Sequence, residues 1–131
     1  MKNSEQNSDV LRIDAEQLEK SGVTIIRIAG AIDAHTYEQI EEYFDNILSN
    51  GSVRLILDLS SVRYMSSAGI GVFVGGLARS RQAGGDLLLL NMTPTVHETL
   101  DLLGLAPMFF VAPDKATAVA YFERQGLAVK R

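Results

Sequence analysis

Residues 53–59 form an apolar run, VRLILDL, in which both alternating sets of positions are mostly hydrophobic. A strand with one face in water would alternate apolar and polar residues, so this run is typical of a strand that helices cover on both faces. A segment with a glycine-rich helical pattern follows after a short polar connection, includes residues 72–79 and runs to about residue 82. A buried strand followed so closely by a helix indicates an α/β fold with parallel strand pairing.

The remaining segments continue this alternation of strands and helices. Two strands are expected at 10–18 and 23–29, and the short Ser21-Gly22 turn between them predicts an antiparallel hairpin. Capping residues and apolar patterns predict strands at 87–90 and 109–111, and helices over 34–49 with Asp33 as cap, from Thr93 to Gly104, and from Asp114 onward. This order predicts a mostly parallel central sheet of four to five strands, an antiparallel N-terminal hairpin and about four helices.

The composition indicates one globular domain and excludes several classes of partner. The 131 residues carry a net charge of −4 and no cysteine, which argues against nucleic acid as the main partner and excludes disulfides and thiolate metal sites. No apolar stretch is long enough to span a bilayer, so we expect no membrane insertion and a cytoplasmic location. We expect residues 1–8 to form a disordered polar tail and residues 9–131 to form the domain.

Two adjacent hydroxyl groups, those of Ser66 and Ser67, lie where the central strand ends and the next helix begins. Serine is a favoured helix N-cap, and capping accounts for most serines in such places. The same place suits a phosphate, because unpaired N–H groups and the helix dipole stabilise an anion there. A phosphate on either serine would therefore be held without unfolding the helix, and it would add nearly two negative charges.

The residues around the serines leave two interpretations open. Gly69 and Gly71 each cost about 1 kcal/mol relative to alanine inside a helix. This cost indicates either close approach of another backbone or a tight fit of the helix on its own sheet. Met65 and Ile70 belong either to the core or to an exposed docking patch.

The longest motif, LILDLSSVRYMSSAGIG over residues 55–71, resembles the signature of STAS domains, specifically the bacterial anti-sigma factor antagonists. Residues 30–36 resemble the motif that follows the family's second strand. Residues 84–87 and 102–105 fall where the family has similar residues. The resemblance covers the chain from about residue 10 to residue 124, and it implies a STAS-like single domain.

This resemblance implies a partner-switching mechanism. The unmodified antagonist would bind an anti-sigma factor that is also a serine kinase of the GHKL ATPase type, and this binding would release a sigma factor. The kinase would phosphorylate Ser67, which would end the binding, and a PP2C-type phosphatase would reset the protein. Ser66 stands where many relatives have an acidic residue, and it is the second choice of acceptor. The implied partner-binding residues are Asp33, Thr36, Met65, Ser66, Ser67, Ala68, Gly69 and Ile70.

Two other classes of function fit the residues less well. A nucleophile elbow would need glycine where Tyr64 precedes the serines, and neither His35 nor His97 has the spacing of a metal site, so we expect no enzyme and no metal. A dinucleotide motif would need a third glycine at Val74, so we expect no cofactor. The family alternative is a STAS scaffold or regulatory subunit of a stress-signalling or lipid-transport complex that is not phosphorylated. We expect a monomer or weak dimer.

Overall fold

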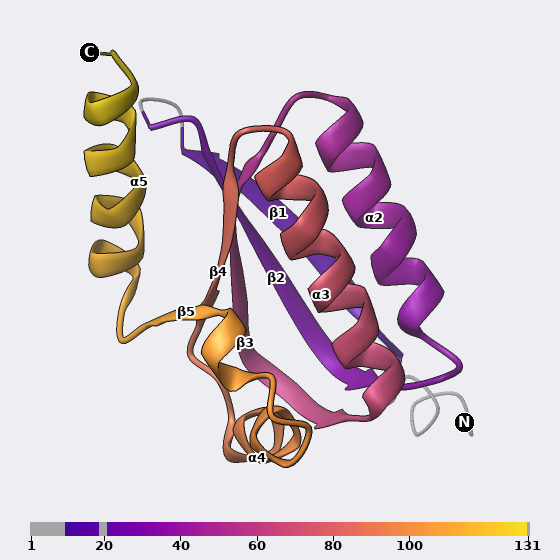
Figure 1. Cartoon of the computed structure of the whole chain (residues 1–131). Coiled ribbons are helices and arrows are strands. Elements are labelled where there is room, and N and C mark those ends of the chain that lie inside the picture. The colour runs from indigo at the N-terminus through magenta and orange to yellow at the C-terminus, as the bar shows by residue number, and fades with distance from the viewer. Residues whose placement is uncertain (1–9, 19–20, 131) are drawn as a thin grey trace.

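The computed structural model describes residues 10–18 and 21–130, with side chains described up to residue 124. These residues form a five-stranded sheet in the order β1-β2-β3-β4-β5 (Figure 1). The first pair is antiparallel and the other pairs are parallel, which confirms the predicted α/β architecture. The strands are β1 (Arg12–Leu18), β2 (Val23–Ile32), β3 (Arg54–Met65), β4 (Asp86–Leu90) and β5 (Phe110–Ala112).

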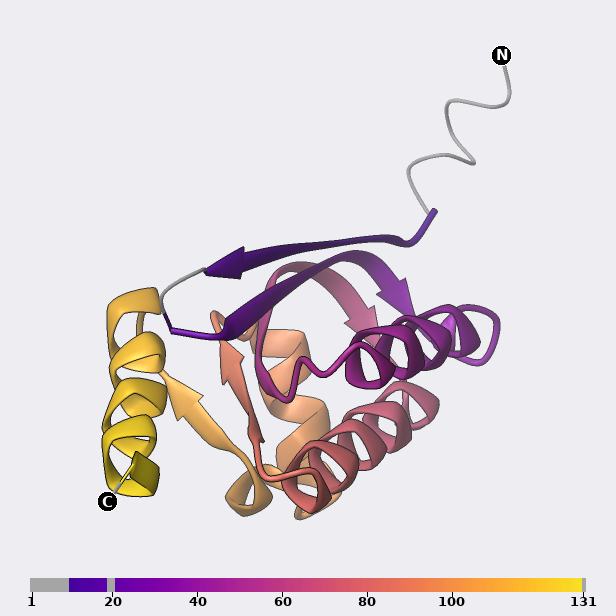
Figure 2. The same ribbon diagram turned by 90° about the horizontal axis from the view of Figure 1, so that it is seen from above.

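The helices lie on both faces of this sheet. Figure 2 shows α2 and α3 side by side along one face, with α5 apart from them on the other side. A shorter helix, α4, lies near the end of the sheet where β3 finishes (Figure 1). The helices are α2 (Tyr37–Ser49), α3 (Ser67–Gln82), α4 (Pro94–Leu102) and α5 (Lys115–Lys130), with a 3-10 turn η1 (Ala106–Met108) before β5.

The sheet separates two hydrophobic clusters. Ile26 and Leu57 belong to the larger cluster beneath α2 and α3, whereas their neighbours Ile25 and Ile56 belong to the smaller cluster with Phe122 of α5. Successive strand residues point to opposite faces, so an apolar residue is needed at every position where both faces are covered. This arrangement confirms the expectation drawn from residues 53–59.

The central strand β3 is longer than the sequence predicted, because it continues through residues 60–65 to Met65. Ser60, Ser61, Arg63 and Tyr64 in this extension are exposed, so the apolar pattern that identified the first half of the strand is lost there. The pairing with β2 also shifts twice, between Arg27 and Ala29 and between Gly30 and Ala31. Such bulges insert extra residues into one strand and re-aim its side chains.

The prediction that Asp33 caps a helix beginning at residue 34 was wrong. The helix α2 begins at Tyr37, and its N-cap position is Thr36. Asp33 instead stabilises the preceding turn, where its Oδ1 accepts a hydrogen bond of 2.8 Å from the N–H of His35. The other predicted caps are confirmed: Thr93 Oγ1 accepts from the N–H of Val96, and Asp114 Oδ1 accepts from the N–H of Thr117.

Two further expectations concern the N-terminal tail and membrane insertion. The predicted tail at residues 1–8 lies outside the described residues. Within the described part of the chain, no helix has both the length and the apolar character needed to cross a membrane.

Candidate functional site

The serine pair lies at the junction between β3 and α3, and its two members have different roles. Ser66 is the N-cap of α3, with its Oγ accepting a hydrogen bond of 3.3 Å from the N–H of Ala68. Its carbonyl also accepts from the N–H of Gly69 at 3.0 Å. Ser66 therefore fills the capping role that sequence reasoning allowed for either serine.

Ser67 is the first residue of α3, and its side chain is exposed. Among the described residues, no hydrogen bond to its hydroxyl is formed, so the oxygen faces solvent. The first turn of α3 contains no acidic residue, so the field of the helix dipole is not offset within that turn. The site thus combines an accessible hydroxyl with a position where an added anion is stabilised.

The loop after β2 lies directly beside the serine turn. Ile32 pairs with Met65 in the parallel ladder, and the N–H of Ser66 donates to the carbonyl of Ile32 at 2.9 Å. Parallel strands end at the same edge of a sheet, so residues 33–36 and the serine pair share that edge. This places Asp33 and Thr36 in the loop next to the serine turn.

Asp33 and Thr36 are half-buried and hold their own loop in shape. The hydroxyl of Thr36 donates to the carbonyl of Ala31 at 2.8 Å and accepts from the N–H of Asp33 at 3.0 Å. The carbonyl of Asp33 accepts from the N–H of Tyr37 at 2.9 Å. These bonds give the loop a defined conformation beside Ser66, which a binding surface needs.

Three of the expected partner-binding residues lie beneath this surface. Met65 and Ile70 are each 2% exposed, and Gly69 is also buried. Of the two interpretations left open, the core one is correct for Met65 and Ile70, because both belong to the cluster under α2 and α3. Their buried side chains cannot contact a docked partner directly. The prediction that they are partner contacts is therefore corrected: they pack beneath the surface and support it.

The two glycines of the first turns have different reasons to be present. A Cβ atom on Gly69 would lie 2.4 Å from Cγ2 of Ile32, so the tight fit of the helix on its own sheet explains this glycine. Gly71 is exposed, and a Cβ there would meet nothing within 4 Å. Packing within the described residues therefore does not require glycine at position 71.

Sequence reasoning missed two threonines of the α4 region that hold the end of β3. The hydroxyl of Thr93 donates to the carbonyl of Val62 at 3.1 Å, and that of Thr99 donates to the carbonyl of Met65 at 3.2 Å. Thr93 was assigned only a capping role. No local pattern marks these contacts, because 31 and 34 residues separate the partners.

Charge on the α2 side of the site is mainly negative. The exposed acidic side chains of α2 are Glu38, Glu41, Glu42 and Asp45. Asp45 forms an ion pair of 2.6 Å with Arg79, which joins the outer surfaces of α2 and α3.

Comparison with known families identifies the family of the domain. Residues 13–118 match the family model of the STAS domain. The chain belongs to the STAS domain family. The serine turn of this STAS domain lies between β3 and α3. It is part of the motif at residues 55–71 that resembles the family signature.

Several relatives of this STAS domain are antagonists of anti-sigma factors. The anti-sigma F factor antagonist of Paenibacillus polymyxa is 26% identical over 86% of this chain and 97% of its own. The anti-sigma-B factor antagonist of Listeria monocytogenes is 33% identical over 62% of this chain and 71% of its own. The anti-sigma factor antagonist SpoIIAA in its unphosphorylated form has a TM-score of 0.69, with 25% identity over 88% of this chain and 97% of that one.

The STAS domain offers no arrangement typical of a metal centre in the part that the structure describes. No group of three or more histidine and acidic side chains gathers closely enough to hold an ion there. His97 pairs with Asp101 of the same helix at 3.1 Å, and His35 lies exposed in the loop after β2. The serine site presents an exposed residue, Ser67, at the first position of α3.

Proposed function

We propose that this STAS domain is an anti-sigma factor antagonist. In its unmodified form it binds an anti-sigma factor that is also a serine kinase of the GHKL ATPase type, and this binding releases a sigma factor. The kinase phosphorylates Ser67, which ends the binding, and a PP2C-type phosphatase restores the active form. The protein acts in the cytoplasm as a monomer or weak dimer, and it is a binding protein rather than an enzyme.

The observation that carries this proposal is the exposed hydroxyl of Ser67 at the first position of α3. A kinase needs an accessible acceptor, and no protein group competes for this oxygen among the described residues. The relatives named as antagonists support the choice of partner class. The structure of SpoIIAA in its unphosphorylated form indicates that phosphorylation is relevant to that relative.

Ser67 is a better acceptor than Ser66 for a structural reason. The Oγ of Ser66 is half-buried and accepts a hydrogen bond from the N–H of Ala68, so its modification would disturb the cap of α3. Loss of such a cap costs about 1 kcal/mol. Ser67 has no such constraint, so a phosphate can be added there while the fold stays as it is.

Electrostatics explains how the modification would end binding. The phosphate would carry nearly two negative charges at the exposed start of α3. A partner that packs over Ser67 would have to desolvate this dianion, which costs several kcal/mol when no cation pairs with it. A loss of about 3 kcal/mol weakens a complex by more than a hundredfold.

The partner surface is formed by the exposed and half-buried members of the predicted set. Ser67 and Ala68 contribute from α3, and Asp33 and Thr36 contribute from the adjoining loop. Gly71 lies one turn further along α3 and is exposed. Its missing side chain would allow the backbone of a partner to approach the helix closely, which accounts for a glycine that the fold itself does not require.

The test begins with the cognate kinase, ATP and the intact protein. Mass spectrometry should find phosphate on Ser67 and not on Ser66. Ser67→Asp should weaken binding to the kinase at least tenfold, whereas Ser67→Ala should retain it. The matched control is Gln82→Glu, which adds a negative charge to the far end of the same helix and should leave binding unchanged.

Two outcomes would contradict the proposal. Equal binding by the aspartate and alanine variants would reject the charge mechanism. An absence of modification by the kinase, combined with a STAS domain found in a stable multiprotein complex, would favour the alternative of an unphosphorylated regulatory subunit in stress signalling or lipid transport.

A further inference from the structure

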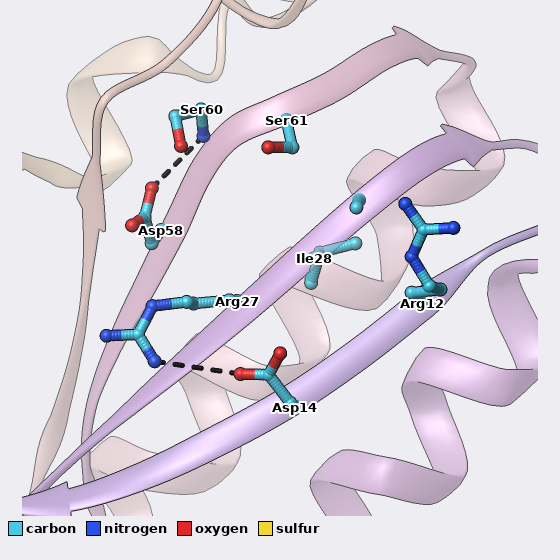
Figure 3. A pocket seen from close by; sticks show the side chains of 8 residues that line it. Arg12, Asp14, Arg27, Ile28, Asp58, Ser60 and Ser61 are labelled. Atoms are coloured by element: carbon cyan, nitrogen blue, oxygen red, sulfur yellow. Dashed lines mark hydrogen bonds and ion pairs between the residues drawn. The ribbon is translucent and has the colours of Figure 1, made fainter.

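The face of the sheet opposite α2 and α3 is only partly covered. α5 packs over the part that contains Ile25, Ile56 and Leu88. Further toward the carboxyl ends of β2 and β3, this face carries polar side chains and forms a pocket of about 190 Å³. Figure 3 shows the side chains that surround it on β1, β2 and β3, which include Arg12, Asp14, Arg27, Asp58, Ser60 and Ser61.

Strand register arranges these side chains in two rows across the sheet. Arg12 pairs with Ala29 on β2, which pairs with Ser61 on β3. In the next row, Asp14 pairs with Arg27, which pairs with Asp58. The small side chain of Ala29 lies between a cation and a hydroxyl, so the first row is hollow at its centre.

The two arginines differ in how far neighbouring carboxylates neutralise them. Arg27 donates a hydrogen bond of 2.7 Å to Glu16 and lies 3.6 Å from Asp14. Its bond to Glu16 lowers the pKa of that carboxyl group. Arg12 has no ion pair with any described side chain, and the neighbours in its own row are uncharged. The pocket therefore contains one guanidinium group whose charge is available to a ligand.

A bulge in β3 brings two hydroxyl groups to the same pocket. Arg27 pairs with Asp58 and Ala29 pairs with Ser61, so β3 has one more residue in this interval than β2. Ser60 and Ser61 are consecutive, yet both are exposed and both line the pocket. Among the described residues neither side chain makes a hydrogen bond, so both hydroxyls are free to bind a ligand. Bulges are frequent beside binding sites, where they redirect side chains in this way.

We propose that this pocket binds a small hydroxy acid. The guanidinium of Arg12 and the hydroxyl of Ser61 would hold the carboxylate above Ala29. Asp58, whose Oδ1 accepts from the N–H of Ser60 at 3.1 Å, would accept a hydrogen bond from the hydroxyl of the ligand. The carboxylates of Asp14 and Asp58 would repel a highly charged anion. They can accept a hydrogen bond from a ligand that carries its own donor, such as a hydroxyl group.

The size of the pocket limits the ligand. The pocket has a volume of about 190 Å³. Pockets for drug-sized ligands usually reach at least about 300 Å³, so this pocket suits a smaller ligand. The volume and the polar lining together favour a small hydroxy acid, and the proposal does not depend on phosphorylation of Ser67.

The test is a titration of the isotope-labelled full chain with malate, in which NMR monitors the signals of the backbone amides. Malate should produce saturable shifts centred on Ala29, Ser60 and Ser61. Succinate, which lacks the hydroxyl group, should bind at least tenfold more weakly. Arg12→Gln should reduce the affinity for malate at least tenfold, and Arg79→Gln, which removes an arginine on the opposite face, should leave it unchanged.

Three results would overturn the proposal. The first is an absence of saturable shifts with malate, and the second is equal affinity for succinate and malate. The third is unaltered malate binding by Arg12→Gln. Because Arg12 is exposed, its variant should retain the dispersed amide spectrum of the folded protein, and Ser61→Ala provides a second variant that should also weaken binding.

Discussion

The backbone N–H of Ser66 donates a hydrogen bond of 2.9 Å to the carbonyl of Ile32. This bond joins the ends of β2 and β3 at the point where the chain enters α3. It holds the loop of Asp33 and Thr36 beside the serine turn, so two segments about thirty residues apart in sequence form one surface. The proposed switch depends on this juxtaposition.

The two serines should differ in their effect on stability. Ser66→Ala removes the oxygen that accepts from the N–H of Ala68, so it should lower the free energy of unfolding by about 1 kcal/mol. Ser67→Ala changes an exposed side chain and should stay within about 0.5 kcal/mol of the parent protein. Urea denaturation followed by circular dichroism measures both. Equal losses would show that capping is shared.

Gly69 and Gly71 form a matched pair within one helix. Gly69→Ala should destabilise the protein by about 1–3 kcal/mol, because the new methyl group would overlap the side chain of Ile32. Gly71→Ala should stabilise it by up to about 1 kcal/mol, since space is open there and alanine favours a helix. Thermal unfolding of the two variants provides the measurement. A destabilised Gly71→Ala variant would contradict this account.

Tyr121 should contribute to the docking of α5 through its hydroxyl group. That hydroxyl donates a hydrogen bond of 2.6 Å to Oδ2 of Asp86, a side chain that is buried at the start of β4. Tyr121→Phe should therefore lower the free energy of unfolding by about 1–2 kcal/mol. Tyr64→Phe is the control, because Tyr64 is 51% exposed and should tolerate the change. Chemical denaturation measures the free energy of unfolding of both variants. Equal losses in the two variants would refute the role of the Tyr121 hydroxyl.

The pKa of Glu16 should lie below its ordinary value of 4.5, chiefly because its carboxylate accepts a hydrogen bond from Arg27. A lowered pKa in the folded state means that the pair contributes stability above pH 4.5. This contribution is lost as the pH falls through the folded pKa. An NMR titration of the glutamate side chains measures the value directly. In Arg27→Gln the pKa of Glu16 should return toward 4.5, and an unchanged pKa would reject the assigned cause.

Much of the architecture follows from patterns that are local in the sequence. The apolar run at 53–59 predicted a strand buried on both faces, and the Ser21-Gly22 turn predicted the hairpin. The cap Thr93 and the following Pro94 predicted the start of α4. These features depend on residues near one another in the chain, so periodicity and capping chemistry suffice to predict them.

The extension of β3 and the start of α2 were beyond such reasoning. Residues 60–65 are mostly polar because α5 covers only part of that sheet face, and a strand with an open face loses the apolar signal of a buried one. The turn at 33–36 delays α2 because the hydroxyl of Thr36 bonds to the carbonyl of Ala31. A local hydrogen bond from a side chain to the backbone competes with helix formation. The sequence pattern does not predict which of the two forms at residues 33–36.

By itself, the sequence determined that two hydroxyls stand between a strand and a helix. Only the tertiary structure decided that Ser66 caps the helix while Ser67 faces solvent, and that Met65 and Ile70 lie in the core. The physical reason is that burial depends on which distant segment covers a residue. Here β2 and α4 contact β3 from far along the chain, and they leave Ser67 exposed.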